Sequence, residues 1–545
     1  MKARLVVRFS MLLAVALLCL GFGVYSFFRL NAVGERHDFN LYSLVPQDAI
    51  AVLETGRMAA LVDDINALPC SKDDHFLDVS DIFVYLKDHL HTFVDDTPHG
   101  LSSQMNKMLI SFHEPDTPQN QIFYCTLGND DLDMVESFVT KYCSSTFPSR
   151  FIDYKGEEIR IYPMPEGRFL AVYVAKDFLV ASFQKRLVER VIDAYRGRQA
   201  LADDADFTQI HTDKHSRADA TLYVRLQQVE MGKNTDKTSA HFELGSWTEF
   251  DLKLNHEAIY CSGLNHVADT THLLLQAMKN VEPTEEVVGE LLPASTFFSA
   301  QWTLVEWHPL LTFVTSQPTH SQPMDTIIRQ QDDEMIAYLE KHTFPDAVAC
   351  QFVPKDTLDK LPGAVISLPL RNRAMAERDL RRWLRQNSWD EGYDCRPDFQ
   401  HFAPYYPIGR QLRHYLLPHN QLFSQLTGVE HPCYYTYACF YRNRLLLAPD
   451  SRSLLAYVEA LEAGDTLSST LLYEELSRHL SATVGFSLVA DMEQLMPLPE
   501  EYVRLVPRFF FKQSSFFRHF VLAVQLTVAD GQLSPNIVLL YKPRS

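Results

Sequence analysis

The chain has 545 residues, a formal net charge of −19 at pH 7 and a hydrophobic content of 46%. This length exceeds what one ordinary core organises and indicates roughly two to four domains, and the hydrophobic content excludes the disordered class. The charge argues against nucleic acid and against a peripheral grip on anionic lipid, because phosphate binding uses clusters of Lys and Arg and we find no basic run.

The first element in chain order is an apolar run, Phe9 to Phe28, which predicts a transmembrane signal anchor. At about 1.5 Å per residue it spans roughly 30 Å, the hydrocarbon thickness of a bilayer. The preceding tail, residues 1–8, carries Lys2, Arg4 and Arg8, so the positive-inside rule places it in the cytoplasm. We expect a single-pass protein of a bacterial inner membrane whose body lies in the periplasm. A cleaved signal peptide is the alternative, although the run ends in bulky residues.

Beyond a juxtamembrane leader, residues 29–43, the sequence predicts one unit written twice, over residues 44–268 and 291–545. A helical and acidic linker, residues 269–290, joins the two copies. Similar segments recur in the same order, which is typical of internal duplication. Hairpins with tight links imply antiparallel strands. The expected fold class is therefore α+β, with two tandem units of antiparallel sheet and packed helices after one N-terminal transmembrane helix.

Four repeat-matched positions support this alignment. Asp116 in FHEPDT corresponds to Asp356 in FVPKDT, and each lies in a predicted turn between two strands. Arg160 in GEEIRIY corresponds to Arg413 in GRQLRHY. The two arginines are candidates to bind a carboxylate, and an ion pair at a strand edge or between the units is the alternative.

Later elements also occur twice. A hairpin is predicted to turn at residues 176–177 in the first copy and at residues 442–443 in the second. Amphipathic helices follow, from Gln184 to Tyr195 and from Ser451 to Leu461.

The openings of the two copies, LVPQDAIAVLE from Leu44 and LLPASTFFSAQW from Leu291, have a Pro at matching places. They resemble the repeated LPADTxxxL-like openings of an uncharacterised bacterial domain-of-unknown-function family of N-terminally anchored envelope proteins. The resemblance implies the anchored, repeated architecture, and it implies no activity.

Motifs for catalysis or for cofactors do not stand out. There is no GxSxG, HExxH, P-loop or GxGxxG motif, so we assign no catalytic residue, no cofactor and no metal ligand. His211 and His215 have a spacing that suits zinc on a helix, but solvated loop histidines are the simpler interpretation. Asp203, Asp204 and Asp206 resemble a calcium loop in composition, and helix capping explains them more simply.

Nine cysteines are present without a CxxC pair, and several lie in strand-like runs where a buried free thiol is the usual role: Cys125, Cys261, Cys350 and Cys439. Disulfides are permitted outside the cytoplasm, and their pairing stays open.

An expansion in the second copy, Asn387 to His431, is crowded with aromatic residues among Arg and His, as interface hot spots are. A well-packed loop is the alternative. The candidate interaction surface consists of Trp389, Tyr393, Tyr405, Tyr406, Arg413 and Tyr415.

These patterns favour a non-catalytic scaffold or interaction protein of the cell envelope, with the lipid bilayer and other envelope proteins as partners. One alternative is a ligand-binding module that holds a peptide, lipid or glycan in a groove between the two repeats. A second alternative is a hydrolase without a recognisable motif.

Overall fold

The computed structural model describes most of the chain from Phe39 onward, with gaps. The described residues are 39–72, 80–86, 88, 107–115, 117–128, 131, 149–164, 167–211, 218–225, 229–230, 232, 241–242, 247–265, 288–308, 326–355, 361–386, 414–418, 423, 426–427, 429, 435–481, 484–529 and 532–542. The predicted anchor, Phe9 to Phe28, lies outside them. None of the helices within these ranges is long and apolar enough to cross a membrane.

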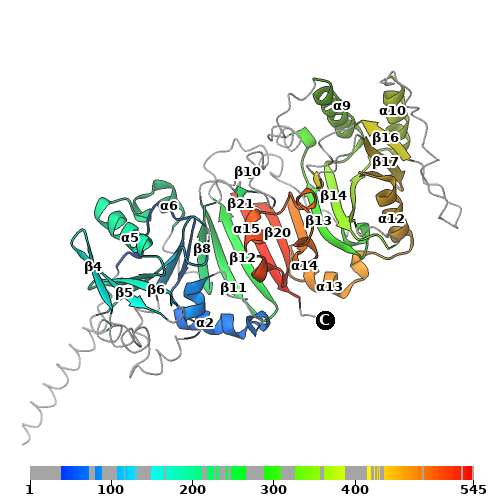
Figure 1. Cartoon of the computed structure of the whole chain (residues 1–545). Coiled ribbons are helices and arrows are strands. Elements are labelled where there is room, and N and C mark those ends of the chain that lie inside the picture. The colour runs from blue at the N-terminus through cyan, green and yellow to red at the C-terminus, as the bar shows by residue number, and fades with distance from the viewer. Residues whose placement is uncertain are drawn as a thin grey trace, which may run out of the picture. The chain divides into compact units, whose positions relative to one another are not determined.

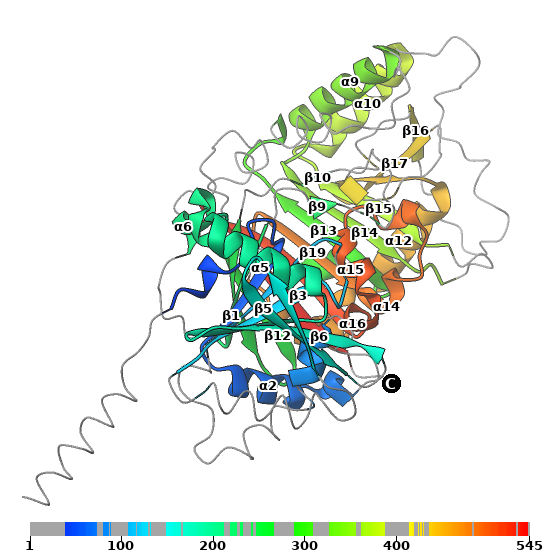
Figure 2. The same ribbon diagram turned by 60° about the vertical axis from the view of Figure 1, so that its left-hand side comes forward.

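Among the described residues, the strands form two antiparallel runs, one of seven strands and one of twelve, each within its own compact unit (Figures 1 and 2). A separate pair of short strands, β9 (Val229–Glu230) and β10 (His241–Phe242), belongs to neither run. Helices pack on both runs. The expected fold class of two tandem α+β units, one per repeat, is therefore wrong. The chain instead divides into two compact units with different boundaries: Met1–Val62 with Ser80–Ala205, and Asp63–Val79 with Asp206–Ser545.

The first unit contributes seven strands in the order β1-β2-β3-β7-β6-β5-β4. Helix α5 packs against β3, β5, β6 and β7, and the 3₁₀ helices η1 and η4 contact each other. The strands are β1 (Ala51–Thr55), β2 (Met108–Phe112), β3 (Gln121–Thr126), β4 (Arg150–Tyr154), β5 (Glu157–Pro163), β6 (Phe169–Val174) and β7 (Phe178–Ser182). The helices are η1 (Leu41–Ser43), α5 (Lys185–Gly197) and η4 (Leu201–Asp203), while α2 (Met58–Ala67) and α6 (Ala205–Ile210) run across the boundary between the units.

The second unit contributes twelve strands in the order β8-β11-β12-β21-β20-β19-β13-β14-β15-β18-β17-β16. Its strands are β8 (Ala220–Val224), β9 (Val229–Glu230), β10 (His241–Phe242), β11 (Thr248–Leu254), β12 (Ala258–Asn265), β13 (Thr296–Thr303), β14 (Asp346–Phe352), β15 (Gly363–Pro369), β16 (His414–Pro418), β17 (Tyr435–Tyr441), β18 (Arg444–Ala448), β19 (Phe486–Asp491), β20 (Phe520–Ala529) and β21 (Gln532–Tyr541). Its helices are η2 (Pro69–Lys72), η5 (Val288–Leu291), α9 (Thr326–His342), α10 (Arg373–Gln386), α12 (Ser451–Glu462), η6 (Leu467–Ser469), α13 (Leu471–Ser477), α14 (Met492–Leu495), η7 (Glu500–Tyr502), α15 (Arg508–Lys512) and α16 (Ser514–Phe517).

Matching elements of the two halves have the same neighbours. The run β1-β2-β3-β7-β6-β5 has its counterpart in β13-β14-β15-β18-β17-β16. The opening segments of the two copies also make equivalent backbone hydrogen bonds. The amide of Leu201 donates to Val45 O at 2.7 Å, and the amide of Leu467 donates to Leu292 O at 2.7 Å. The hairpins expected at residues 176–177 and 442–443 are confirmed as β6–β7 and β17–β18.

The seam β12–β21 explains why a repeat is not a folding unit here. Strand β12 closes the first half of the sequence, yet it pairs antiparallel with β21 at the end of the second half, from Ala258 opposite Leu540 to Asn265 opposite Leu533. The first-half strands β8 and β11 follow β12 into the same run. A repeat in the sequence shows which elements correspond, but it does not show with which copy's strands a given strand pairs.

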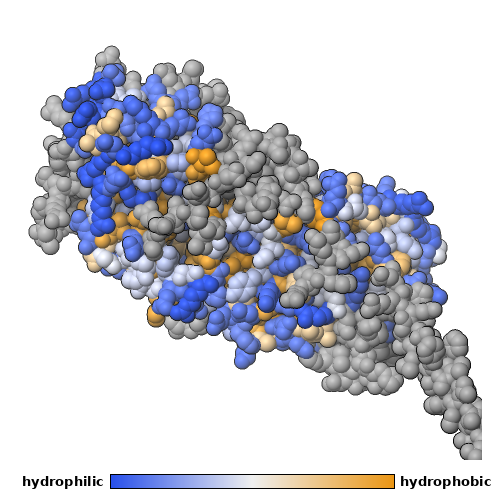
Figure 3. Space-filling view, turned by 180° about the vertical axis from the view of Figure 1, so that it is seen from behind, coloured by the Kyte–Doolittle hydropathy of each residue, from blue (hydrophilic) through white to orange (hydrophobic). Residues whose placement is uncertain are grey.

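Burial distinguishes the covered strands β14 and β15 from the terminal strand β4. Strands β14 and β15 are buried at almost every position, as expected for strands covered on both faces, and β4 is mostly exposed. Helix α5 turns Leu187, Val188 and Val191 inward at helical spacing. Figure 3 shows hydrophilic residues over much of one face, with patches of hydrophobic residues among them.

Candidate functional site

Most residues of the predicted interaction surface lie outside the described part of the chain. The same holds for two of the repeat-matched positions. These residues are Trp389, Tyr393, Tyr405, Tyr406, Arg413, Asp116 and Asp356. Arg160 and Tyr415 are described.

Arg160 lies on β5, next to the terminal strand β4 of the first unit. Its Nε donates to Glu158 Oε1 at 3.0 Å, and its guanidinium lies over the Phe151 ring, 5.6 Å from the centroid. Phe151 is itself 60% exposed. The described contacts of Arg160 are those of a strand-edge ion pair with a cation–π contact.

Tyr415 lies on β16 and is buried against α10. Its hydroxyl donates to Glu377 Oε1 at 2.7 Å and accepts from Arg381 Nε at 2.7 Å, while Arg381 Nη2 reaches the same carboxylate at 2.5 Å. Burial, with the hydrogen bond to Glu377, raises the pKa of Tyr415. This triangle uses the carboxylate of Glu377 and fixes one flank of α10.

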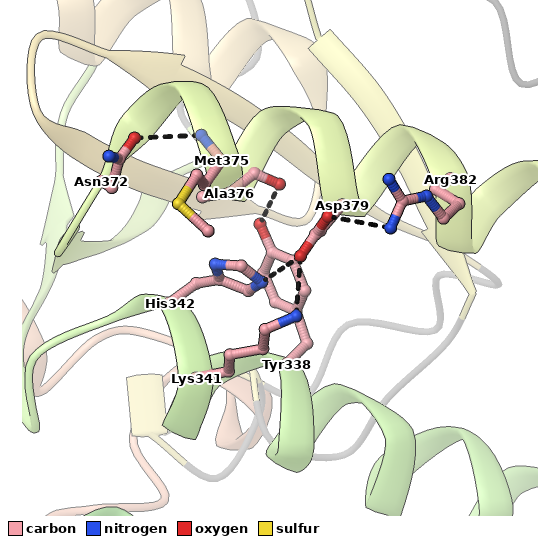
Figure 4. A network of polar contacts seen from close by, with 8 residues as sticks. All are labelled: Tyr338, Lys341, His342, Asn372, Met375, Ala376, Asp379 and Arg382. Carbon is pink, nitrogen blue, oxygen red and sulfur yellow. Dashed lines mark hydrogen bonds and ion pairs between the residues drawn. The ribbon is translucent and has the colours of Figure 1, made fainter.

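Asp379 occupies the other flank of α10 and joins it to α9 (Figure 4). Its Oδ2 accepts from Lys341 Nζ at 2.8 Å and lies 3.2 Å from His342 Nε2, and its Oδ1 lies 3.4 Å from Arg382 Nη1. The hydrogen bond from Lys341 lowers the pKa of Asp379, and burial together with the nearby Lys341 charge lowers the pKa of His342. Tyr338 adds a hydrogen bond to the Ala376 carbonyl at 3.0 Å.

The outer surface of α10 carries a row of arginines, which we call the arginine face: Arg378, Arg382 and Arg385. Their spacing of four and three residues places them on one side of the helix, and all three are exposed. Met375 continues the row one turn earlier and is 49% exposed. Both carboxylates of α10, Glu377 and Asp379, face its flanks and are already bonded, so the row has a local positive charge.

Sequence reasoning missed this face. We found no basic run, yet residues 371–385 hold six arginines and only two carboxylates. These arginines are Arg371, Arg373, Arg378, Arg381, Arg382 and Arg385. Counting charge in short windows would have found them, because the overall charge of −19 hides a local excess.

A second polar group lies inside the first unit. Ser111 Oγ is 2.8 Å from His113 Nε2, and His113 Nδ1 is 3.4 Å from Asp48 Oδ1, in the order of a Ser–His–Asp triad. Tyr124 OH lies 3.0 Å from Ser111 Oγ, and Arg190 pairs with Asp48. Within the described part of the chain His113 Nδ1 makes no hydrogen bond, so the residue order of a triad is present without a hydrogen bond from the histidine to the aspartate.

The burial of Ser111 and His113 distinguishes this arrangement from a working catalytic triad. Ser111 is 0% exposed and His113 is 1% exposed, so a substrate cannot reach the hydroxyl. Burial lowers the pKa of His113 to about 4, which makes it a very weak base. The matched positions of the second copy hold Gln351 and Val353, so the Ser111–His113–Asp48 arrangement occurs in the first copy alone.

The remaining candidate ligands have other contacts where the structure describes them. His211 stacks on Phe207 at 5.6 Å, and its proposed zinc partner His215 lies outside the described residues. Asp203 accepts the amide of Ala200 at 3.2 Å, which is a capping contact. Within the described ranges no three His, Cys, Asp or Glu side chains are placed to hold a metal ion.

Four cysteines in the described strands are free, and all four are mostly shielded from water. Burial raises the pKa of Cys125, Cys261 and Cys439 to about 12 and raises that of Cys350 further. Thiols in such surroundings are packing groups and poor nucleophiles.

The fold and these sites define a large antiparallel-sheet protein with an exposed basic helix and a buried Ser–His pair beside the exposed Asp48. Over residues 107–356, from β2 to just beyond β14, the chain matches the family described as Protein of unknown function (DUF3352). The expected resemblance to an uncharacterised domain-of-unknown-function family is thereby confirmed. No curated protein and no solved structure matches the chain.

Proposed function

We propose that this chain is a non-catalytic interaction protein of the cell envelope that engages partner proteins through α10 and the segment that follows it. The observation that carries the proposal is the arginine face. A row of exposed guanidinium groups is unusual on a chain of net charge −19 and attracts acidic partners. The aromatic segment from Asn387 begins directly after α10, so the two surfaces are continuous in sequence.

Proximity labelling tests this interaction role. We expect the whole chain, fused to a proximity-labelling enzyme, to mark a small and reproducible set of envelope proteins. A variant that lacks residues 387–413 keeps every described element, because the deletion stops just before β16. This variant should label that set of proteins several-fold less. Equal labelling by both chains would mean that the segment after α10 contributes only packing.

The proposal places the body outside the cytoplasmic membrane, held by Phe9 to Phe28. We expect the whole chain to stay in the membrane fraction after alkaline extraction, and we expect a variant without residues 9–28 to become soluble. The reason is that moving twenty mostly apolar residues from lipid to water is strongly unfavourable. The whole chain in intact spheroplasts should also be cut by added protease. Protection of the body from protease would contradict this location.

A hydrolase is the second candidate, and only the Ser111–His113–Asp48 chain favours it. We expect no labelling of Ser111 by a fluorophosphonate probe on the folded chain, because its hydroxyl is fully buried. The matched variant Ser111→Ala should give the same background labelling. Stoichiometric labelling of the native chain that disappears in Ser111→Ala would replace the non-catalytic proposal with an acyl-enzyme mechanism.

A further inference from the structure

We propose that the arginine face of α10 binds an acidic helix of a partner protein, whose carboxylates repeat at the spacing of the arginines. This inference rests on the proposed interaction function and names the chemistry of the partner. It depends on four exposed residues of one helix, Met375, Arg378, Arg382 and Arg385.

The geometry of the row fits a helix. At about 1.5 Å of rise per residue, Arg378, Arg382 and Arg385 span roughly 10 Å along the axis. Glu or Asp side chains at positions i, i+4 and i+7 of a neighbouring helix cover the same length. Arginine offers a planar fork that matches a carboxylate with two parallel hydrogen bonds, which lysine cannot do. Met375 adds a flexible apolar contact at one end of the row.

The local charge is available for such a partner. Arg378 and Arg385 form no ion pair with any residue over the described ranges. Arg382 is only 3.4 Å from Asp379, whose Oδ2 is already held by Lys341. Glu377 is engaged on the opposite flank by Arg381 and Tyr415. The carboxylates of α10 therefore leave the outer row electropositive.

The width of the positive surface favours a helix over an anionic membrane. Helix α9 lies beside α10 in both views and carries Asp333 and Glu340 at exposed positions. A flat anionic bilayer that covered both helices would press phosphates against these carboxylates. A partner one helix wide meets the arginines alone, and acidic groups on α9 would repel it from the wrong register.

The test places a photo-cross-linking residue on the row in the whole chain within its own membranes. The substitution Met375→p-benzoylphenylalanine puts the cross-linker at the exposed end of the row. The adducts are then mapped by mass spectrometry. We expect a protein adduct whose cross-linked peptide is rich in Asp or Glu. In the variant R378Q/R382Q/R385Q the yield should fall about tenfold, equivalent to about 1.4 kcal/mol, because three exposed ion pairs are lost together.

The matched control removes the same formal charge away from α10. Arg186, Lys253 and Arg452 are exposed on other elements, and their triple change to glutamine should leave the yield unchanged. With the arginine row unmodified, the yield of adduct should fall as the salt concentration is raised, because exposed ion pairs are screened. Triple Arg→Lys variants should keep part of the yield, since the charge stays and the bidentate geometry is lost.

The proposal is overturned by an unchanged yield in the arginine variant, by adducts only to lipid or nucleic acid, or by a cross-linked peptide without acidic residues. A second cross-linker at exposed Phe151 separates this failure from failure of the interaction function. Protein adducts from Phe151 alone would overturn the α10 assignment and keep an interaction protein. Protein adducts from neither position would overturn both.

Discussion

The variant Gly263→Val is expected to lower the free energy of unfolding of the second unit by about 3 kcal/mol. Gly263 lies on β12 at the seam with β21. A Cβ built there would lie 2.6 Å from Phe250 Cε1 and 2.6 Å from the Pro535 carbonyl oxygen, and the latter is backbone that cannot swing away. The clash would push apart the strands that join the two halves of the sequence.

Tryptophan fluorescence during urea denaturation measures this effect selectively. The five tryptophans of the chain, Trp247, Trp302, Trp307, Trp383 and Trp389, belong to the second unit. The control is the same substitution in the first unit, Gly56→Val, where nothing lies within 4 Å of a Cβ, and its tryptophan midpoint should equal that of the unmodified chain. A midpoint for Gly263→Val equal to that of the control would mean that β12 does not pack against β21 as described.

The first unit is expected to lose about 2 kcal/mol of stability between pH 7.5 and pH 5 through His113 alone. Burial holds the pKa of this imidazole at about 4 in the folded chain, against an ordinary value of 6.5. Between these two values the unfolded chain binds the proton and the folded chain does not. The contribution of His113 is therefore fully present above pH 6.5 and is lost as the pH falls towards 4.

Amide hydrogen exchange in β2 and β3 at several pH values, after correction for intrinsic rates, reports this loss. The variant His113→Gln keeps an acceptor for Ser111 and does not titrate in this range, so its protection should change less with pH. Exchange in the control His256→Gln, at an exposed turn of the second unit, should follow the unmodified chain. Identical pH dependence in His113→Gln and the unmodified chain would falsify the assignment.

Local patterns in the sequence identified elements well where the physics is local. Turn residues between alternating apolar runs located the hairpins β6–β7 and β17–β18. The apolar spacing after each hairpin located α5 and α12 within one or two residues of their ends. The tight turns gave the correct pairing of β6 with β7 and of β17 with β18, because a short turn forces consecutive strands to pair.

Other features depended on contacts between residues far apart in sequence. The seam between β12 and β21 joins strands more than two hundred residues apart, and apolar composition alone does not specify which edge a strand meets. In the sequence, nothing distinguishes Ser111 and His113 from ordinary residues of a strand and its end. Only the fold brings Asp48 and Tyr124 beside them. The arginine face was visible as composition, but its exposure follows from which side of α10 packs inward, at Ala376, Leu380 and Leu384.

The sequence by itself determined the repeated order of elements, the resemblance to an uncharacterised family, and the hydrophobic run from Phe9 to Phe28 on which the proposed address depends. Those features are local, because they follow from turn chemistry, periodicity and the length of an apolar segment. Only the tertiary structure decided that the last hairpin of the first half completes the sheet of the second. It also decided that Ser111 and His113 are buried and that a row of arginines faces solvent. Strand-edge pairing and burial are properties of the packed chain, and no short segment carries them alone.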